Sequence, residues 1–229
     1  MGEAGNKDHV KGHRARLRER FLKGGADALA DYELLELILF LAIPRRDVKP
    51  LAKDLIARFG SYAGVLSADI AQLRTMKGLG ETAIAAIKSV QASALHLAKA
   101  QAHNRPVLGN WDAVTDYLQG AMGHIPREQF RLLFLDRKNT LIADEVLSDG
   151  TIDHTAVYTR EVIRRALELE AGALILVHNH PSGDPSPSSA DVRMTKEISE
   201  ACQRVGVKVH DHIIVGKTGQ ASFNNLGLL

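Results

Sequence analysis

Two histidines separated by one residue end an apolar run, and a proline-rich segment with an aspartate follows them. Residues 173–177 carry mostly branched apolar side chains, which predicts a buried strand that ends at His178. Because residues i and i+2 of a strand point to one side, His178 and His180 can both face one ion. The prolines and the glycine of residues 181–187 prevent a continuous helix or strand, and the resulting loop can bring Asp191 back. Two imidazoles and one carboxylate form a ligand set that leaves one position of a tetrahedral zinc ion open, as in catalytic zinc sites.

Each part of this pattern also has a simpler interpretation. An isolated His-x-His pair is more often a pair of surface or core histidines than a pair of ligands. Ser188 and Asp191 fit a helix start, with Ser188 as the N-cap of a helix over residues 189–205. The two interpretations of Asp191 are compatible, because a side chain in the first turn projects toward the segment before the helix.

A second His-x-His pair lies within a strand pattern over residues 207–215. Simple alternation places Asp211 on one face with the valines and isoleucine of this segment, and His210 and His212 on the other face. Because no loop returns a third ligand, we predict a structural or supporting role for these histidines rather than a second metal site. Asp211 on an apolar face needs a partner, and the remaining N–H of a ligand histidine would suit it.

The complete string resembles the zinc signature of the JAMM (MPN-type) metalloproteases, in which His-x-His, seven residues and Ser-x-x-Asp follow one another. The matching positions are His178, His180, Ser188 and Asp191. The form HNHPSGDPSPS, with DHIIVG at residues 211–216, resembles the bacterial RadC family, which carries a historical label of DNA-repair proteins. The resemblance covers nearly the whole chain. It implies a Zn2+ cofactor, a JAMM/MPN-like mixed sheet flanked by helices, and hydrolysis of an amide or isopeptide bond in a protein or peptide substrate.

The resemblance also implies roles for residues outside the ligand set. The family glutamate at the start of the first sheet strand takes a proton from the attacking water, and Glu128 occupies the matching place. Glu145, on a strand of the same predicted hairpin, is the second choice for this base. Ser188 would donate a hydrogen bond to the developing oxyanion. Asn179 stands where peptidases of the family often carry Ser or Thr, and we expect this difference to influence substrate preference. We expect both Asn179 and Asp211 to support the metal ligands without binding the metal themselves.

The first part of the chain predicts an all-α domain over residues 1–100. Capping residues and apolar periodicity predict helices at residues 31–43, 47–59, 61–66, 67–73 and 81–100. Residues 1–23 hold seven Lys/Arg against three acids, an excess of four positive charges. Within them, residues 12–21 could form a basic helix on phosphates or a solvated terminal helix.

A glycine turn between two of these helices resembles the helix-hairpin-helix motif, which contacts the DNA backbone without reading sequence. On this resemblance, phosphate contacts would come from the turn and the next helix start. The residues concerned are Lys77, Gly78, Gly80 and Thr82. Glu81 departs from the motif, because phosphate contact favours a neutral or basic residue. Close packing of two helices is the alternative role of the turn.

Residues 101–110 break the helical pattern and predict a linker, so the metal-binding domain would span residues 111–229. Within it, the patterns predict a short helix at 112–122, a hairpin from 129–136 and 141–147, a third strand at 154–158, and a helix at 159–170. With the strands around residues 173–177 and 207–215, the fold class is α/β, with a mixed sheet flanked by helices.

Composition limits the remaining possibilities. A chain of 229 residues with 45% hydrophobic content can bury the cores of two small domains. The single cysteine, Cys202, excludes an intrachain disulfide framework, suits a reducing cytoplasm, and is expected to be a packed thiol. The longest apolar run, residues 34–43, is interrupted by Glu36 and is far shorter than the ~20 residues of a bilayer span. Together with the absence of a signal-peptide pattern, this predicts a soluble cytoplasmic protein without a membrane partner.

Two other zinc enzyme classes are excluded by their motifs. Nucleobase deaminases require cysteine ligands that one cysteine cannot supply, and zincins require His-Glu-x-x-His, which does not occur. The alternative from a different class is a non-catalytic DNA-binding or protein-interaction module with a structural metal. A net charge of +2 says little about partners, and the sequence leaves the oligomeric state open.

Overall fold

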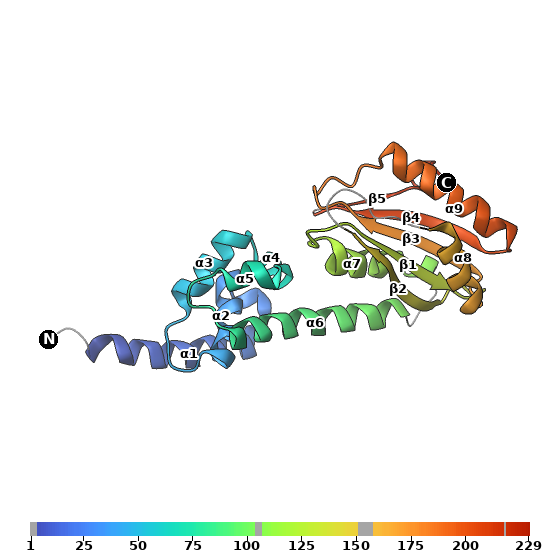
Figure 1. Ribbon diagram of the computed structural model, residues 1–229. Helices are drawn as coiled ribbons and strands as arrows, with labels where there is room; N and C mark the ends of the chain where they lie inside the picture. Colours follow the sequence, from blue (N-terminus) through green and yellow to red (C-terminus); the bar gives the residue numbers. More distant parts are fainter. Residues whose placement is uncertain (1–3, 104–106, 151–157, 218) are drawn as a thin grey trace. The chain divides into compact units, whose positions relative to one another are not determined.

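Two compact units, Met1–Ser93 and Ala94–Leu229, divide the chain in the computed structural model (Figure 1). The structure describes residues 4–103, 107–150, 158–217 and 219–229. The division lies within helix α6 (Glu81–His103), ahead of the predicted linker at residues 101–110. It lies there because Ala98, late in α6, already packs against the core of the second unit.

The first unit is all helical, and each of the five helices predicted over residues 31–100 is found within three residues of its predicted bounds. Its helices are α1 (Ala4–Gly24), η1 (Ala26–Ala28), α2 (Asp31–Ala42), α3 (Lys49–Phe59), α4 (Tyr62–Ser67), α5 (Ile70–Arg74) and the first part of α6. Fully buried side chains from five of them, Leu35, Leu55, Val65, Leu73 and Ile87, meet in one core. None of the helices in the described part of the chain combines the length and the apolar character that a membrane span requires.

The second unit is built on a five-stranded mixed sheet with strand order β2-β1-β3-β4-β5. Its elements are η2 (Val107–Gly109), α7 (Trp111–Met122), β1 (Gln129–Leu135), β2 (Leu141–Asp149), α8 (Thr159–Glu168), β3 (Ala173–Asn179), α9 (Ser189–Arg204), β4 (Lys208–Val215) and β5 (Gln220–Ser222). Strands β3 and β4 are parallel, and the other neighbours are antiparallel. The α/β class and the β1–β2 hairpin are therefore confirmed. Residues 154–157 of the predicted third strand lie outside the described residues, and Tyr158 precedes α8 without strand structure.

Helices cover both faces of this sheet, with α7 on one face and α8 and α9 on the other (Figure 1). On the α7 face, Leu118 packs with Leu133 and Val177. On the opposite face, Ile198 of α9 packs with Leu132, Leu176 and other side chains of alternate strand positions. Every residue of β3 is buried, as expected for a strand covered on both sides. Such a strand can hold a side chain at its end in a fixed place.

A β-bulge in β4 exchanges the two faces of this strand. The pairing with β3 passes from Leu174–Val209 to Ile175–Asp211, so that His210 is the extra residue. Val209 packs in the layer of α8 and α9, whereas Ile213 packs in the layer of α7. The prediction that the odd-numbered residues of 207–215 share one face is therefore wrong, because the bulge interrupts the alternation.

Candidate metal centre

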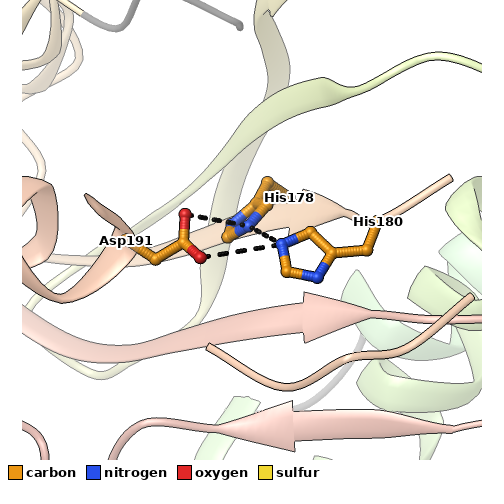
Figure 2. Close-up of side chains that lie close together, drawn as sticks. All are labelled: His178, His180 and Asp191. Carbon is orange, nitrogen blue, oxygen red and sulfur yellow. Dashed lines mark hydrogen bonds and ion pairs between the residues drawn. The ribbon is translucent and has the colours of Figure 1, made fainter. Parts of the chain in front are cut away.

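Strand β3 and helix α9 bring His178, His180 and Asp191 together (Figure 2). A hydrogen bond of 2.9 Å from the His180 N–H to the Val215 carbonyl extends the pairing with β4 beyond the end of β3, so the backbone is fixed at both histidines. Asp191 lies in the first turn of α9, and its carboxylate faces the imidazoles. The Nε2 atoms of the histidines are 2.9 Å apart. Asp191 Oδ1 is 3.4 Å from Nε2 of His178, and Oδ2 is 3.6 Å from Nε2 of His180.

These separations fit the ligand atoms of a zinc ion. With bonds of about 2.0–2.1 Å, ligand atoms of a tetrahedral zinc ion lie about 3.3 Å apart. Nδ1 of His180 is 2.8 Å from the carbonyl oxygen of Asp184. Because this oxygen can only accept, Nδ1 carries the proton of the neutral imidazole, and Nε2 keeps its lone pair. The donor atoms of this group therefore fit zinc in spacing and in chemistry.

Charge is distributed unequally over the three groups. Burial lowers the pKa of His178 to about 4, so this imidazole is neutral at neutral pH. The hydrogen bond with Asp191 raises the pKa of His180, and the charge of Glu128 adds a smaller effect of the same sign. Burial acts to raise the pKa of Asp191, but hydrogen bonds with His180 and Ser188 outweigh it and hold this pKa well below its usual value. The group thus favours one positive charge between its members, either a proton on His180 or a bound cation.

Ser188 is the N-cap of α9 and forms a reciprocal capping box with Asp191. Its Oγ accepts a hydrogen bond of 3.2 Å from the Asp191 N–H, and Oδ2 of Asp191 accepts one of 2.7 Å from the Ser188 N–H. The capping interpretation of these two residues is therefore confirmed. It also leaves other contacts open to both, because the cap uses a lone pair of Ser188 Oγ and not its proton. Oδ1 of Asp191 stays directed at His178.

The loop between β3 and α9 is docked on the end of β4. The Lys217 N–H donates to the Gly183 carbonyl at 3.2 Å, and the Gly183 N–H donates to the His180 carbonyl at 2.9 Å. A Cβ atom on Gly216 would lie only 2.4 Å from the Gly183 carbonyl oxygen. Glycine at this position therefore allows the loop to approach the strand closely and carry Asp184 to His180.

Glu128 lies immediately before β1, half-buried, in a segment that Asn179 holds in place. Oδ1 of Asn179 accepts from the Gln129 N–H at 2.9 Å, and Nδ2 donates to the carbonyls of Ile125 at 3.2 Å and Arg127 at 3.0 Å. The Asn179 side chain is buried, and these bonds lie on the opposite side of the strand from His178. Asn179 is thus placed to fix the backbone that carries Glu128.

Comparison with known proteins covers both units. Residues 108–228 match the RadC-like JAB domain family, and residues 12–85 match the UPF0758 N-terminal family. A UPF0758 protein of Rhodobacter capsulatus is 57% identical over 213 residues, which cover 93% of this chain and 100% of that protein. A UPF0758 protein of Ruegeria pomeroyi is 54% identical over 221 residues, which cover 96% of this chain and 99% of that protein. This chain belongs to the RadC (UPF0758) family. Its second unit has the JAB-type fold of that family.

The partners of Asp211 in this RadC-family chain differ from the prediction. Its carboxylate accepts from Ser222 Oγ at 2.5 Å, from the Asn224 N–H at 2.9 Å and from the His212 N–H at 2.7 Å. Nδ1 of His178 is instead 2.8 Å from Nε2 of His212. The predicted contact of Asp211 with a ligand histidine is therefore wrong, because the bulge carries Asp211 to the other face of β4. Asp211 connects β4 with the segment after β5.

Two residues that support the histidines were missed or left without a specific role. His212, predicted only as structural or supporting, is fully buried and touches His178 directly. Thr195, for which the sequence predicted no role, lies one helical turn after Asp191 and contacts Nδ1 of His212 at 2.5 Å. Its position four residues after Asp191, on the same face of α9, is the signal that could have found it.

The second choice for the base has another partner. Glu145 lies on β2 and pairs with Arg165 of α8, with Nε of Arg165 at 2.9 Å from Oε2. Two glutamates, Glu145 and Glu168, raise the pKa of this guanidinium. Glu145 is therefore an ion-pair partner that links β2 to α8, and Glu128 remains the better candidate in this RadC-family chain.

The glycine turn of the first unit connects α5 and α6, as predicted. Gly78 has φ of +87°, and Arg46 donates a hydrogen bond of 2.9 Å to its carbonyl. Lys77, Gly80 and Thr82 are exposed. Glu81, the residue that departs from the motif, pairs with Arg74 at 2.9 Å. The negative charge of Glu81 is thus partly balanced beside the turn.

Proposed function

We propose that this RadC-family protein is a zinc-dependent hydrolase, similar to a metallopeptidase, that cleaves an amide or isopeptide bond. The observation that carries the proposal is the convergence of three ligand atoms, from His178, His180 and Asp191, within the spacing of a tetrahedral site. Glu128 adds to it, because its charge already acts on His180. A carboxylate beside an open metal position is the arrangement that hydrolytic zinc sites use.

The roles follow from the positions of the side chains. Bound zinc would act as a Lewis acid that polarises the scissile carbonyl and lowers the pKa of water. Glu128 would accept a proton from the attacking water and return it to the leaving amine. The Ser188 hydroxyl, whose proton the helix cap does not use, would donate to the developing oxyanion. Asn179 would keep Glu128 in reach by holding the backbone on both sides of it.

Metal analysis and a matched pair of variants test the proposal. The purified chain should bind about one equivalent of zinc, and an Asp191→Ala variant should lose it. Cleavage of peptides and of ubiquitin-like conjugates should fall by roughly 10²–10⁴-fold in Glu128→Gln, the usual contribution of a general base, with zinc retained. Glu145→Gln is the control, since it removes the charge of the other hairpin glutamate and should leave cleavage unchanged. Zinc binding without cleavage of any tested substrate would favour the non-catalytic module with a structural metal.

We also propose that the helical unit contacts the DNA backbone through the turn between α5 and α6. The pairing of Glu81 with Arg74 supports this role, because it partly offsets the negative charge that would repel a phosphate at the turn. In gel shifts with the full chain, Lys77→Ala should weaken binding and reduce the slope of affinity against salt by about one. Lys53→Ala is the matched control, because it removes an exposed lysine of α3 that lies over the ring of Tyr32. Equal binding by both variants would exclude the turn as the contact.

A further inference from the structure

We infer that Thr195 and His212 act as a positioning pair that holds His178 with its proton on Nδ1, so that Nε2 offers a lone pair to the metal. This inference deepens the proposed function and rests on its metal site. It concerns a chain of contacts that leads from the backbone of α9 through two buried side chains to His178. The residues act through His178 and would not touch substrate.

The direction of each hydrogen bond in this chain of contacts follows from counting the available protons. Oγ1 of Thr195 is 2.6 Å from the carbonyl oxygen of Asp191. Two oxygens approach this closely only with a proton between them, and the carbonyl has none, so the single hydroxyl proton of Thr195 lies there. Oγ1 is also 2.5 Å from Nδ1 of His212, which must therefore donate its own proton.

The remaining protons are then fixed. A neutral imidazole carries one N–H, so Nε2 of His212 has a lone pair and can only accept. Nδ1 of His178, 2.8 Å away, must donate to it. Nε2 of His178 is then left with a lone pair, and this atom faces Nε2 of His180 and Oδ1 of Asp191. The reverse arrangement would place a proton on the nitrogen that has to bind the metal.

The surroundings of Thr195, His212 and His178 keep both imidazoles neutral and hold the three side chains in place. His212 is fully buried and lies between two phenylalanines, with ring centroids 4.6 Å from Phe223 and 5.9 Å from Phe130. Both rings are buried, and burial disfavours a second proton on either of them despite the nearby carboxylate of Asp191. Thr195 is 1% exposed, so water does not compete for its hydroxyl. Because Asp191 supplies both a ligand oxygen and the carbonyl that starts the chain, the first turn of α9 orients the His178 ring as well as the carboxylate.

The test compares Thr195→Val with Thr195→Ser in the full chain. Valine keeps the shape of the side chain and removes the hydroxyl, so His212 loses its acceptor and the preference for Nδ1–H on His178 is lost. Loss of an outer partner of a metal ligand typically weakens metal affinity by about 10–100-fold, and we expect this loss of zinc affinity in Thr195→Val. Thr195→Ser should restore affinity to near the wild-type value. Thr115→Val is the matched control, because the Thr115 hydroxyl also bonds within a helix, to Asp112, but on the α7 face.

Nitrogen NMR of the metal-free protein with labelled histidine gives a readout that stability does not affect. We expect the His178 signals of the wild type to show a protonated Nδ1 and an unprotonated Nε2. A wild-type spectrum with the proton on Nε2, or unchanged zinc affinity in folded Thr195→Val, would overturn the inference. If Thr195→Val does not fold, the wild-type spectrum alone decides. A wild type with the expected spectrum but no zinc affinity would contradict the proposed metal site and leave the positioning pair intact.

Discussion

The backbone N–H of Gln129 donates to the side-chain oxygen of Asn179 at 2.9 Å, across the pairing of β1 and β3. Asn179 is buried, and its amide nitrogen donates to the carbonyls of Ile125 and Arg127 in the segment before β1. A single side chain thus satisfies three backbone groups around Glu128. This arrangement explains why an amide is suited to the position between His178 and His180.

Asn179→Asp should destabilise the protein and misplace Glu128. The carboxylate can still accept from Gln129, but it would face the carbonyls of Ile125 and Arg127 without a donor. Unsatisfied buried groups cost about 1–3 kcal/mol each, so for two carbonyls we expect a loss of roughly 2–6 kcal/mol in chemical denaturation. Cleavage should fall by about 10²-fold through displacement of the base, while zinc stoichiometry is unchanged. If Asn179→Asp instead lost zinc and kept its activity, the contacts of Asn179 would not be independent of His178 on the opposite face of β3.

Ser188→Ala and Ser188→Gly should separate the cap of α9 from catalysis. Alanine at an N-cap costs about 1 kcal/mol, whereas glycine costs only a few tenths, so thermal denaturation should distinguish the variants. Both lack the hydroxyl, and removal of one oxyanion donor typically lowers the rate by about 10²–10³-fold. We therefore expect equal losses of activity with unequal losses of stability. Activity that follows stability in the two variants would assign Ser188 to capping alone.

Gly78→Ala should destabilise the helical unit irrespective of any DNA contact. The φ of +87° costs a residue with a Cβ about 1–2 kcal/mol, and the added Cβ would lie 2.8 Å from a guanidinium nitrogen of Arg46. The measurement is the free energy of unfolding from urea titration of the full chain. Gly109→Ala is the control, because a Cβ there meets nothing within 4 Å and the backbone φ is not positive. Equal stabilities for the two variants would show that the turn relaxes.

Cys202 should be unreactive in the folded protein. Its side chain is buried on the sheet-facing side of α9, and burial raises the pKa of the thiol to about 11. At pH 8 only about one thiol in a thousand is ionised, and the thiolate is the reactive form. Ellman's reagent should therefore label Cys202 at the rate of unfolding. Fast labelling of native protein would contradict the packing of Cys202, which the sequence analysis predicted.

The sequence was sufficient for features that depend on local pattern. Helix periodicity and capping residues predicted the helices of the first unit, and the apolar run before His178 predicted β3. The proline-rich loop and the helix start at Ser188 predicted that Asp191 would return to the histidines, and the structure brings all three together. Each of these features is encoded in a short continuous segment of the sequence.

Features that depend on pairing between distant segments could not be derived in the same way. Glu128 has no local signal of function, and its position follows from the register that places Phe130 opposite His178. Asn179 reaches residues 125–129 only because β1 is the neighbour of β3. The partners of Asp211 and His212 depend on a bulge that hydrophobic alternation does not reveal. Sequence patterns therefore predicted the three candidate ligands but not the groups that orient them.

The unpaired residue in β4 decides which side chain lies beside His178. A regular ladder of the same residues would pair Ile175 with His210, direct the imidazole of His212 toward α7 and bring Asp211 beside His178 in its place. Loss of His210 alone would remove the bulge but keep Asp211 opposite Ile175 and His212 opposite Leu176. A RadC sequence that is one residue shorter at this point should therefore keep the contact between the two histidines, whereas regular pairing of the full-length strand would abolish it.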